Sequence, residues 1–296
     1  MEYGDKHILV LGAGASGIGA SWVLAQVGAH VVLNDYKPVT LPADEEKRLV
    51  SAGVKIITGR QDESLLDGVD RIVISPGISL DIPIVKAAQA RGIDVVSEVE
   101  VAYELSKSPI VAVTGTNGKT TTTTLLTKVL EGTGKPVRVG GNIGDSLSEV
   151  AYSMPADGFL VAELSSYQLE TIKHFRPIGA IMLNITPDHL ARHKTMENYI
   201  AAKERIFENQ LSTDFMVLNI DDPIVADMEH RVPSYILKIS QHQVVPNGAY
   251  YDKGQCYVTK NGTATPVIGS ADIHIPGSHN IENILTVVAL TYALGV

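Results

Sequence analysis

The order of apolar and polar positions in the first hundred residues alternates between two periods. Short apolar runs predict β-strands at residues 7–11, 30–34, 55–58, 71–75 and 94–96. Stretches with helical spacing lie between them, at residues 17–27, 43–52 and 82–90. Because strands that alternate with helices form parallel sheets with helical crossovers, this part of the chain is predicted to be a Rossmann-like parallel-sheet domain.

A polar segment at residues 106–109 interrupts this rhythm. Ser97 and Glu98 open a short helical stretch before it, so we place a domain boundary between residues 97 and 98. Beyond the segment, strands are predicted at 110–113, 137–139, 158–162, 179–185 and 214–218, helices at 119–131, 196–209 and 285–296, and an antiparallel patch at 250–260. The predicted fold is therefore α/β, with a Rossmann-like domain at 1–97 and a P-loop ATPase-like central domain with a small antiparallel sheet at 98–296.

Composition narrows the class of protein. The 296 residues, 45% of them hydrophobic, are enough for about two domains with separate cores. The 33 acidic and 24 basic side chains give a net charge of −9, which disfavours a broad nucleic-acid surface. The single cysteine, Cys256, excludes an internal disulfide, and no apolar stretch approaches the ~20 residues of a membrane helix. We therefore expect a cytoplasmic, monomeric protein without membrane or nucleic-acid partners.

The strongest chemical signal is a glycine-rich turn between the apolar run 110–113 and the helix that follows. This phosphate turn consists of Gly115, Thr116, Asn117, Gly118, Lys119, Thr120 and Thr121. A strand that ends in Gly-x-x-Gly-Lys-Thr presents successive backbone N–H groups, and the positive end of a helix dipole, to an anion. Lys119 would reach the terminal phosphates of a nucleotide and the Thr120 hydroxyl would coordinate Mg²⁺. The turn therefore predicts an ATP site.

One departure leaves an alternative open for this turn. The general motif has another glycine two residues before Gly115, where this chain has Val113. An ordinary strand-to-helix turn with a surface lysine would also fit the pattern. The strand-loop-helix context favours phosphate binding.

A second glycine-rich turn, residues 12–17, follows the first predicted strand. Asp35 lies at the end of the next strand, as in the dinucleotide-binding fingerprint, in which glycines admit a diphosphate and the acid bonds to a ribose. Ser75 begins another turn at the carboxyl end of a neighbouring strand. The same physics serves any diphosphate ester, including a nucleotide sugar, and a tightly packed strand-turn-helix unit would give the same pattern.

Polar side chains also follow two apolar runs of the second domain. Glu163 comes directly after the run 159–162, where it is placed either as a magnesium ligand or as a solvated acid at a strand end. Residues 184–193 bring together an amide, an acid and imidazoles, so that a metal or substrate shell is predicted there. Zinc is disfavoured because the chain lacks a His-Glu-x-x-His motif, and His193 stays unassigned.

Lys203, Asn280 and Asn283 carry no chemistry by position alone. Lys203 lies in the helix predicted at 196–209, where a lysine is usually a solvated charge. Asn280 and Asn283 share one face of a helix near its start and fit a plain capped helix.

Taken together, these segments resemble the Mur ligases, the ATP-dependent amide-forming enzymes that build the peptidoglycan peptide. The resemblance rests on residues 115–121, 141–144, 163–169, 184–193, 202–203 and 279–283. The first glycine-rich turn, Asp35 and residues 75–78 are similar to those of members that use UDP-N-acetylmuramoyl-L-alanine and D-glutamate. The resemblance covers essentially the whole chain. It implies a third domain that contacts D-glutamate and that this chain lacks.

The resemblance also implies a role for individual residues. ATP would lie on residues 115–121, with Lys119 on its phosphates and Asn280 and Asn283 on the adenine side. One Mg²⁺ would be held by Thr120 and Glu163, and a second by His189 and Lys203, with Lys203 carried as a carbamate. Asn142 and Ser165 would contact the muramoyl-alanine part of the substrate, and Ser16, Asp35 and Ser75 the UDP part. The catalytic set would be Lys119, Glu163, His189 and Lys203.

The activity that this implies is amide formation between UDP-N-acetylmuramoyl-L-alanine and D-glutamate through an acyl phosphate. Another Mur-type amino-acid ligase is an alternative. An NAD-dependent oxidoreductase would explain the turn at 12–17 and Asp35 but not Lys119 and Thr120. A non-catalytic P-loop switch would explain Lys119 and Thr120 but not a second nucleotide turn.

Overall fold

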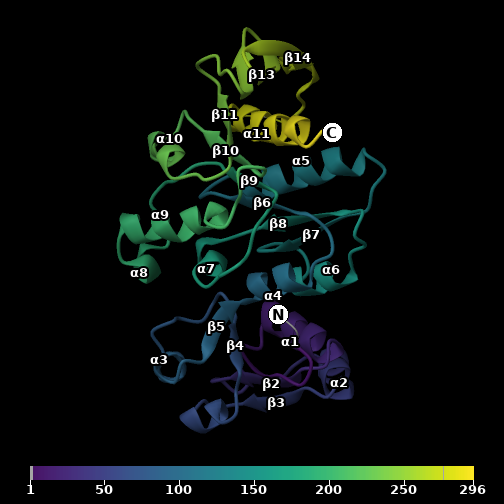
Figure 1. Cartoon of the computed structure of the whole chain (residues 1–296), viewed down its shortest axis with the longest axis vertical. Coiled ribbons are helices and arrows are strands. Elements are labelled where there is room, and N and C mark those ends of the chain that lie inside the picture. The colour runs from purple at the N-terminus through teal and green to yellow at the C-terminus, as the bar shows by residue number, and fades with distance from the viewer. Residues whose placement is uncertain (1–2, 276) are drawn as a thin grey trace. The chain divides into compact units, whose positions relative to one another are not determined.

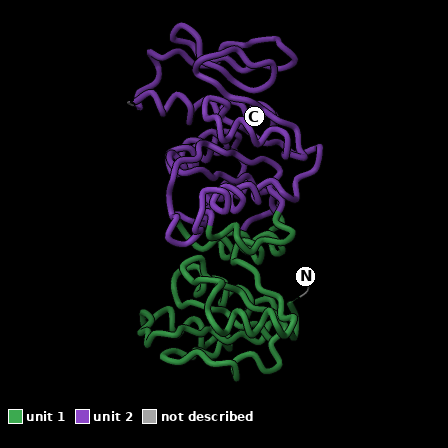
Figure 2. The backbone as a smooth tube through the Cα atoms, turned by 90° about the vertical axis from the view of Figure 1, so that its left-hand side faces the viewer, with its two compact units in different colours: residues 1–107, 144–153, 167–175 green, residues 108–143, 154–166, 176–296 purple. Residues whose placement is uncertain are grey.

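A computed structural model describes residues 3–275 and 277–296 of the chain. The chain forms two compact units (Figure 2). The N-terminal unit contains residues 1–107, 144–153 and 167–175, and the C-terminal unit contains residues 108–143, 154–166 and 176–296. Two short segments from the second half of the sequence therefore pack with the first unit, and the domain boundary between residues 97 and 98 stays a prediction.

The described part of the N-terminal unit holds a parallel five-stranded sheet in the order β3-β2-β1-β4-β5 (Figure 1). The strands are β1 (His7–Leu11), β2 (His30–Asp35), β3 (Lys55–Thr58), β4 (Arg71–Ile74) and β5 (Asp94–Ser97). The helices are α1 (Ala15–Gln26), α2 (Ala43–Ser51), α3 (Pro83–Ala90), α4 (Glu98–Leu105), α6 (Leu147–Ser153) and the 3₁₀ helix η1 (Glu63–Leu66). This strand order confirms the predicted Rossmann-like fold.

Both faces of this sheet are covered by helices. In β1, Ile8 and Val10 pack on one face in a cluster with Leu24 of α1, whereas Leu9 and Leu11 pack on the other face with residues of α3. Strands that are buried on both faces are continuous apolar runs, which is why the sequence pattern identified them.

The described part of the C-terminal unit holds a nine-stranded sheet in the order β14-β13-β12-β11-β10-β9-β6-β8-β7. Its strands are β6 (Ile110–Thr114), β7 (Val137–Gly141), β8 (Phe159–Glu163), β9 (Gly179–Met182), β10 (Phe215–Asn219), β11 (Tyr235–Ser240), β12 (Gly248–Asp252), β13 (Gln255–Lys260) and β14 (Thr263–Gly269). Strands β6 to β12 pair in parallel, and β12, β13 and β14 pair antiparallel, which confirms the small antiparallel sheet.

The remaining helices connect and cover these strands. They are α5 (Lys119–Glu131), α7 (Ser166–Leu169), α8 (Leu190–His193), α9 (Met196–Glu204), α10 (Pro223–Asp227), α11 (His279–Ala293) and the 3₁₀ helices η2 (Arg205–Phe207), η3 (Met228–His230) and η4 (Ser270–Asp272). Helices α5 and α11 lie side by side on one face of the sheet, where Leu126 and Leu290 join its core (Figure 1). Neighbouring β6, β8 and β9 bring their carboxyl ends, and the loops that follow them, to one edge.

Two predicted elements were too long. The helix predicted at 196–209 ends at Glu204 and continues as η2. The strand predicted at 179–185 ends at Met182, because the next residues form a loop against the phosphate turn.

Two buried carboxylates at the start of α4 hold the segments that pack with the N-terminal unit from later in the chain. Glu98 accepts hydrogen bonds from the Ser148 backbone N–H at 2.5 Å and from the Ser146 hydroxyl at 3.0 Å, and burial raises the pKa of its carboxyl. Glu100 accepts three bonds of 2.7–3.1 Å from the successive backbone N–H groups of residues 173–175. Helix α4 therefore fixes two segments that are remote in sequence.

Replacing Glu100 with alanine should lower the free energy of unfolding by about 3 kcal/mol, because three amide groups lose a charged acceptor. Urea denaturation of the Glu100→Ala variant measures this change. Glu46→Ala, at an exposed position of α2, is the matched control and should have little effect. Equal stability of the two variants would contradict the role assigned to Glu100.

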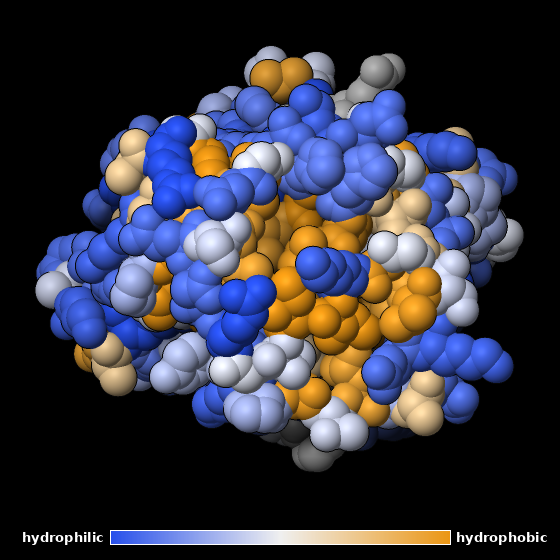
Figure 3. Space-filling model, turned by 90° about the horizontal axis from the view of Figure 1, so that it is seen from below, coloured by the Kyte–Doolittle hydropathy of each residue, from blue (hydrophilic) through white to orange (hydrophobic). Residues whose placement is uncertain are grey.

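The face drawn in Figure 3 is largely hydrophilic, with apolar side chains gathered near its centre. Among the helices that the structure describes, none combines the length and the apolar character needed to cross a membrane.

Candidate active site

The phosphate turn has the backbone shape that its glycines predict. Gly115 has a φ of +147° and Gly118 a φ of +84°, and both values disfavour any other residue. A Cβ atom on Gly115 would lie 2.9 Å from the Cβ of Leu183, and one on Gly118 would lie 2.7 Å from Oδ1 of Asn283. The turn leads into α5, whose first N–H groups have no partners within the helix. These groups form a local site for an anion.

Lys119 lies over this turn. Its Nζ donates hydrogen bonds to the carbonyl oxygens of Gly115 at 3.1 Å and Thr116 at 2.8 Å. Burial lowers the pKa of Lys119, while the negative charges of Glu163 and Asp188 act in the opposite direction. The ammonium group is therefore close to the loops that follow β8 and β9.

Lys203 is buried, so the expectation from position alone, a solvated lysine, was wrong. Its side chain is 2% exposed, and its Nζ donates to the Gly115 carbonyl at 2.7 Å and lies 3.3 Å from Oγ1 of Thr114. Two lysines thus share one carbonyl oxygen. Burial, followed by the charge of Lys119, lowers the pKa of Lys203 to about 7. Helical periodicity gave no signal for this burial, and only the family resemblance singled out Lys203.

Glu163 is also buried, which rules out the alternative of a solvated strand-end acid. It is 1% exposed, and its Oε1 accepts a hydrogen bond of 2.8 Å from the side-chain amide of Asn142. Its other oxygen, Oε2, is buried and has no hydrogen-bond partner. A buried carboxylate oxygen without a partner is costly, and it is the type of donor that Mg²⁺ prefers. The structure thus brings two predicted residues together and leaves one oxygen free for a cation.

His189 and Thr120 lie at exposed positions of the same unit. His189 has a φ of +53°, and its Nε2 is 3.4 Å from Oδ2 of Asp188. The ring of the buried Tyr199 is 6.5 Å from the ring of His189 and 5.0 Å from Nζ of Lys203. Among residues 3–275 and 277–296, no three His, Cys, Asp or Glu side chains are grouped as they would be around a metal ion.

The two asparagines at the start of α11 lie behind the phosphate turn. Asn283 accepts a hydrogen bond from the Thr122 hydroxyl at 3.0 Å and donates one to Oδ1 of Asn280 at 3.0 Å. Both are buried, and Asn283 lies directly beside Gly118. Their contact with adenine remains a prediction.

A buried serine-histidine contact was not predicted from the sequence. Oγ of Ser166 is 2.9 Å from Nε2 of His193, so Ser166, which follows Ser165, contacts α8. The sequence pattern placed His193 near the site but gave no partner for it. Ser165 lies in the loop between β8 and α7.

The N-terminal unit carries its own nucleotide-type turn. Gly12 has a φ of +100°, and a Cβ atom there would lie 2.8 Å from Cβ of Ser75. The carboxylate of Asp35 accepts hydrogen bonds from the backbone N–H groups of Ala13 at 2.9 Å and Lys37 at 3.0 Å. Asp35 therefore fixes the turn, and each of its oxygens keeps a further lone pair that could accept a hydrogen bond from a ribose. Ser16 lies in the first turn of α1.

A cavity of about 640 Å³ adjoins this turn. It is lined by Asp35, Tyr36, Lys37, Gln61, Gly77, Ile78, Ser79, Ile82, Pro83 and Ile84. It lies at the carboxyl ends of β2 and β4, on opposite sides of β1, where open parallel sheets bind ligands. It is therefore the candidate site for a nucleotide-linked substrate.

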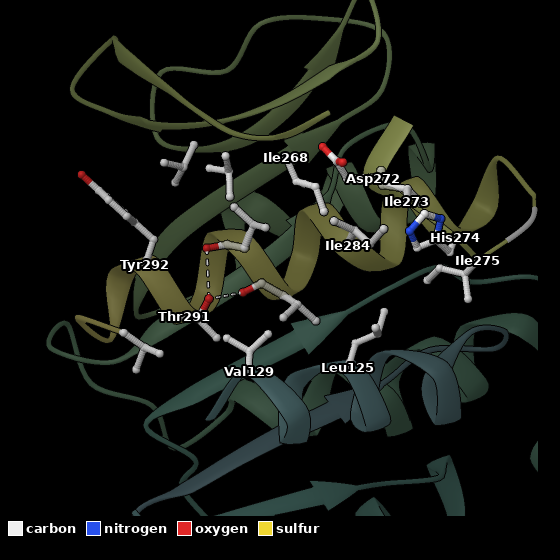
Figure 4. A pocket seen from close by; sticks show the side chains of 15 residues that line it. Leu125, Val129, Ile268, Asp272, Ile273, His274, Ile275, Ile284, Thr291 and Tyr292 are labelled. Atoms are coloured by element: carbon white, nitrogen blue, oxygen red, sulfur yellow. Dashed lines mark hydrogen bonds between the residues drawn. The ribbon is translucent and has the colours of Figure 1, made fainter. Parts of the chain in front are cut away.

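A further cavity, of about 550 Å³, lies between α5, α11 and β14 and is mostly apolar (Figure 4). Leu125 and Val129 of α5 face Ile284 and Thr291 of α11 across it (Figure 4). None of the predicted catalytic residues lines this cavity, so we assign no reaction to it.

Two family models match consecutive parts of the chain. A family model described as "Mur ligase middle domain" matches residues 113–291, and one described as "Mur ligase MurD-like, N-terminal domain" matches residues 6–97. The chain is 44% identical over 296 residues to the UDP-N-acetylmuramoylalanine–D-glutamate ligase of Thermoanaerobacter sp., and 43% identical to that of Pelotomaculum thermopropionicum. Each match covers all of this chain and 65% of the length of the relative.

Solved structures share the fold. The chain is similar, with a TM-score of 0.65 and 21% identity, to the UDP-N-acetylmuramate:L-alanyl-gamma-D-glutamyl-meso-diaminopimelate ligase of Neisseria meningitides, over 99% of this chain and 94% of that one. The UDP-N-acetylmuramate-alanine ligase of Thermotoga maritima gives a TM-score of 0.55 at 23% identity, over 98% of this chain and 65% of that one. Since the middle-domain model alone matches more than half of the sequence, the chain belongs to the Mur ligase family.

Proposed function

We propose that this chain provides the UDP-substrate and ATP sites of a ligase that joins D-glutamate to UDP-N-acetylmuramoyl-L-alanine in peptidoglycan precursor synthesis. The observation that carries the proposal is the phosphate turn, on which Lys119 and Lys203 share the Gly115 carbonyl while Glu163 keeps a free buried oxygen. The names of the relatives support the choice of substrates. We expect the protein to act as a cytoplasmic monomer.

The proposed reaction has two steps. The γ-phosphoryl group of ATP moves to the alanyl carboxylate, so that the bond to ADP breaks and an acyl phosphate forms. The amine of D-glutamate then attacks the acyl carbon, inorganic phosphate leaves, and the amide is formed after loss of a proton. The N–H groups at the start of α5 and the Lys119 ammonium would neutralise charge on the phosphoryl group.

The residues present fit a magnesium site in their chemistry. Thr120 and Glu163 would hold one ion, since Glu163 has a buried oxygen without a partner. His189 and Lys203 would hold the second, since both lie near the Tyr199 ring. Bound Mg²⁺ would supply positive charge against the transferring phosphoryl group.

Lys203 would serve as a metal ligand only after its charge is reversed. Its neutral amine can add CO₂ to form a carbamate, with release of a proton, and its burial beside Lys119 favours the neutral amine. Incubation with ¹³C-labelled bicarbonate should give a carbamate carbonyl signal in the NMR spectrum, and Lys203→Arg should lack it. A signal of equal intensity in that variant would assign the modification to another amine.

The N-terminal cavity would bind the UDP-linked substrate. Calorimetry of residues 1–296 should show tighter binding of UDP-N-acetylmuramoyl-L-alanine than of UDP-N-acetylmuramate or UDP-glucose. NAD should bind more weakly than the UDP ligands, because the relatives with which the chain shares this N-terminal domain are named for a UDP-linked substrate. Preference for NAD over every UDP ligand would favour an oxidoreductase and reject the proposal.

A further inference from the structure

The loop that follows β9 lies against the phosphate turn, and the proposed function leaves one of its residues, Asn184, without a role. The backbone N–H of Thr116 donates to the carbonyl of Asn184 at 2.9 Å. The Asn184 side chain then bonds to the next residue of the turn. Its Oδ1 accepts from the Asn117 backbone N–H at 2.8 Å, and its Nδ2 donates to the Asn117 carbonyl at 3.1 Å.

The Asn184 side chain thus pairs with both backbone groups of one residue. A carboxamide has the same donor and acceptor as a peptide unit, so Asn184 bonds to Asn117 as a neighbouring β-strand would. Asparagine is the shortest side chain with both groups. Aspartate would keep the acceptor and lose the donor, and alanine would lose both.

Thr186 reinforces this contact two residues further along the loop. The Thr116 hydroxyl donates to the Thr186 carbonyl at 3.2 Å and accepts from the Thr186 backbone N–H at 3.0 Å. The hydroxyl of Tyr199 lies 3.0 Å from the same Thr116 oxygen. Thr116 and Asn117 are therefore held at both their backbone and their side-chain groups.

This arrangement divides the N–H groups of the turn between two uses. The N–H groups of Thr116 and Asn117 are already bonded to Asn184. The N–H groups at the start of α5 stay available, because a helix leaves its first amides without internal partners. The contact therefore fixes the part of the turn between Gly115 and Gly118, whose φ values are both positive.

We infer that Asn184 is a positioning residue that holds the phosphate turn in its binding shape before nucleotide arrives. A turn that is already ordered loses less conformational entropy on binding, so its affinity for a polyphosphate is higher. The same contact joins the turn to the loop that carries Asp188 and His189. This inference rests on the proposed ATP site, but the contact itself can be tested without ATP.

The first experiment measures amide hydrogen exchange at Asn117 in the nucleotide-free protein. Asn184→Ala should speed exchange of this amide about tenfold or more, because the loss of a hydrogen bond opens it to water. Asn184→Asp keeps the acceptor and should leave this amide protected. Asn247→Ala is the matched control, because Asn247 accepts a backbone N–H bond of 2.8 Å from Asn261 in a remote turn. Unchanged exchange in Asn184→Ala would overturn the inference.

The second experiment measures affinity for ADP with Mg²⁺ by calorimetry. Asn184→Ala should weaken binding about tenfold. Asn184→Asp should weaken it further, since its added negative charge lies near the phosphates and faces the Asn117 carbonyl. Affinity for the UDP ligand should stay unchanged in both variants, which a general loss of folding would not allow.

The two experiments distinguish the proposed ATP site from the positioning role of Asn184. If the wild-type chain binds no nucleotide but exchange responds to Asn184→Ala, the ATP proposal fails and the contact stands. If wild type binds nucleotide and both variants bind it equally well, the positioning role is rejected. Should Asn184→Ala fail to fold, Asn184→Leu takes its place in both experiments, because leucine has a similar size, carries no charge and lacks both the donor and the acceptor.

Discussion

Replacing Lys119 with alanine is expected to weaken binding of ATP to this chain by about a hundredfold and to leave binding of the UDP ligand unchanged. Lys119 is the one cationic side chain of the phosphate turn itself, and its Nζ lies within 3.1 Å of two carbonyl oxygens of that turn. Its loss removes the charge-assisted bonds to the terminal phosphates. The proposed site of the UDP group lies in the N-terminal unit, which does not contain Lys119.

Calorimetry with each ligand measures this division of labour. Lys128→Ala is the matched control, because Lys128 is an exposed lysine of the same helix that pairs only with Glu131 among its described contacts. It should bind both ligands like the wild type. Equal loss of ATP and UDP-ligand binding in Lys119→Ala would refute the separate roles of the two units.

Replacing Glu163 with glutamine should abolish most of the increase in ATP affinity that Mg²⁺ causes. In the presence of Mg²⁺, the affinity for ATP should fall about a hundredfold, while the stability of the folded chain should not fall. Glutamine keeps the oxygen that accepts from Asn142 and removes the charge from a buried carboxylate whose second oxygen has no partner. Burial of a charged oxygen without a hydrogen-bond partner is costly, so the variant should unfold at the same or a higher temperature than the wild type. The Glu163 carboxylate would thus lower the stability of the folded chain and provide a metal ligand.

Titration of ATP at several Mg²⁺ concentrations, together with a thermal melt, measures both effects. Glu208→Gln, at a position where the acid pairs with Arg205 at the surface, is the control and should change neither. If Glu163→Gln melts several degrees lower and binds Mg²⁺-ATP normally, the free oxygen has a structural role only.

The turns of both nucleotide sites could be predicted from the sequence because their backbone shapes require glycine. Gly12, Gly115 and Gly118 all have positive φ values, and a Cβ atom at each would meet a neighbour within 3.0 Å. Such positions restrict the residue type so strongly that the backbone conformation can be predicted from the sequence. The strands that lead into them were predicted because burial on both faces makes them continuously apolar.

The burial of Lys203 could not be predicted in the same way. Polar and apolar residues are mixed around helix α9, so no apolar stripe indicates which side faces the protein. Its burial depends on Gly115 and Thr114, which are almost ninety residues away in the chain. Contacts of this kind have no local pattern.

The segments held by Glu98 and Glu100 were missed for a related reason. Two acidic residues at the start of a helix are ordinarily assigned to its dipole. Here their carboxylates are buried and accept backbone N–H groups from residues 148 and 173–175. Nothing near Glu98 or Glu100 in the sequence indicates these partners.

Strand β14 was missed because it contains Pro266 and is mostly exposed, so its residues do not alternate between apolar and polar. Its place at the edge of the sheet explains both features, since an edge strand tolerates a residue without an N–H group.

The most direct test of the account is a crystal structure of this chain with a non-hydrolysable ATP analogue and Mg²⁺. We expect the terminal phosphates to lie on the N–H groups at the start of α5, with the Lys119 ammonium turned from the Gly115 and Thr116 carbonyls onto the phosphates. An ion should lie between Thr120 and the free oxygen of Glu163. Phosphates bound elsewhere, with Lys119 still on those carbonyls, would contradict the account.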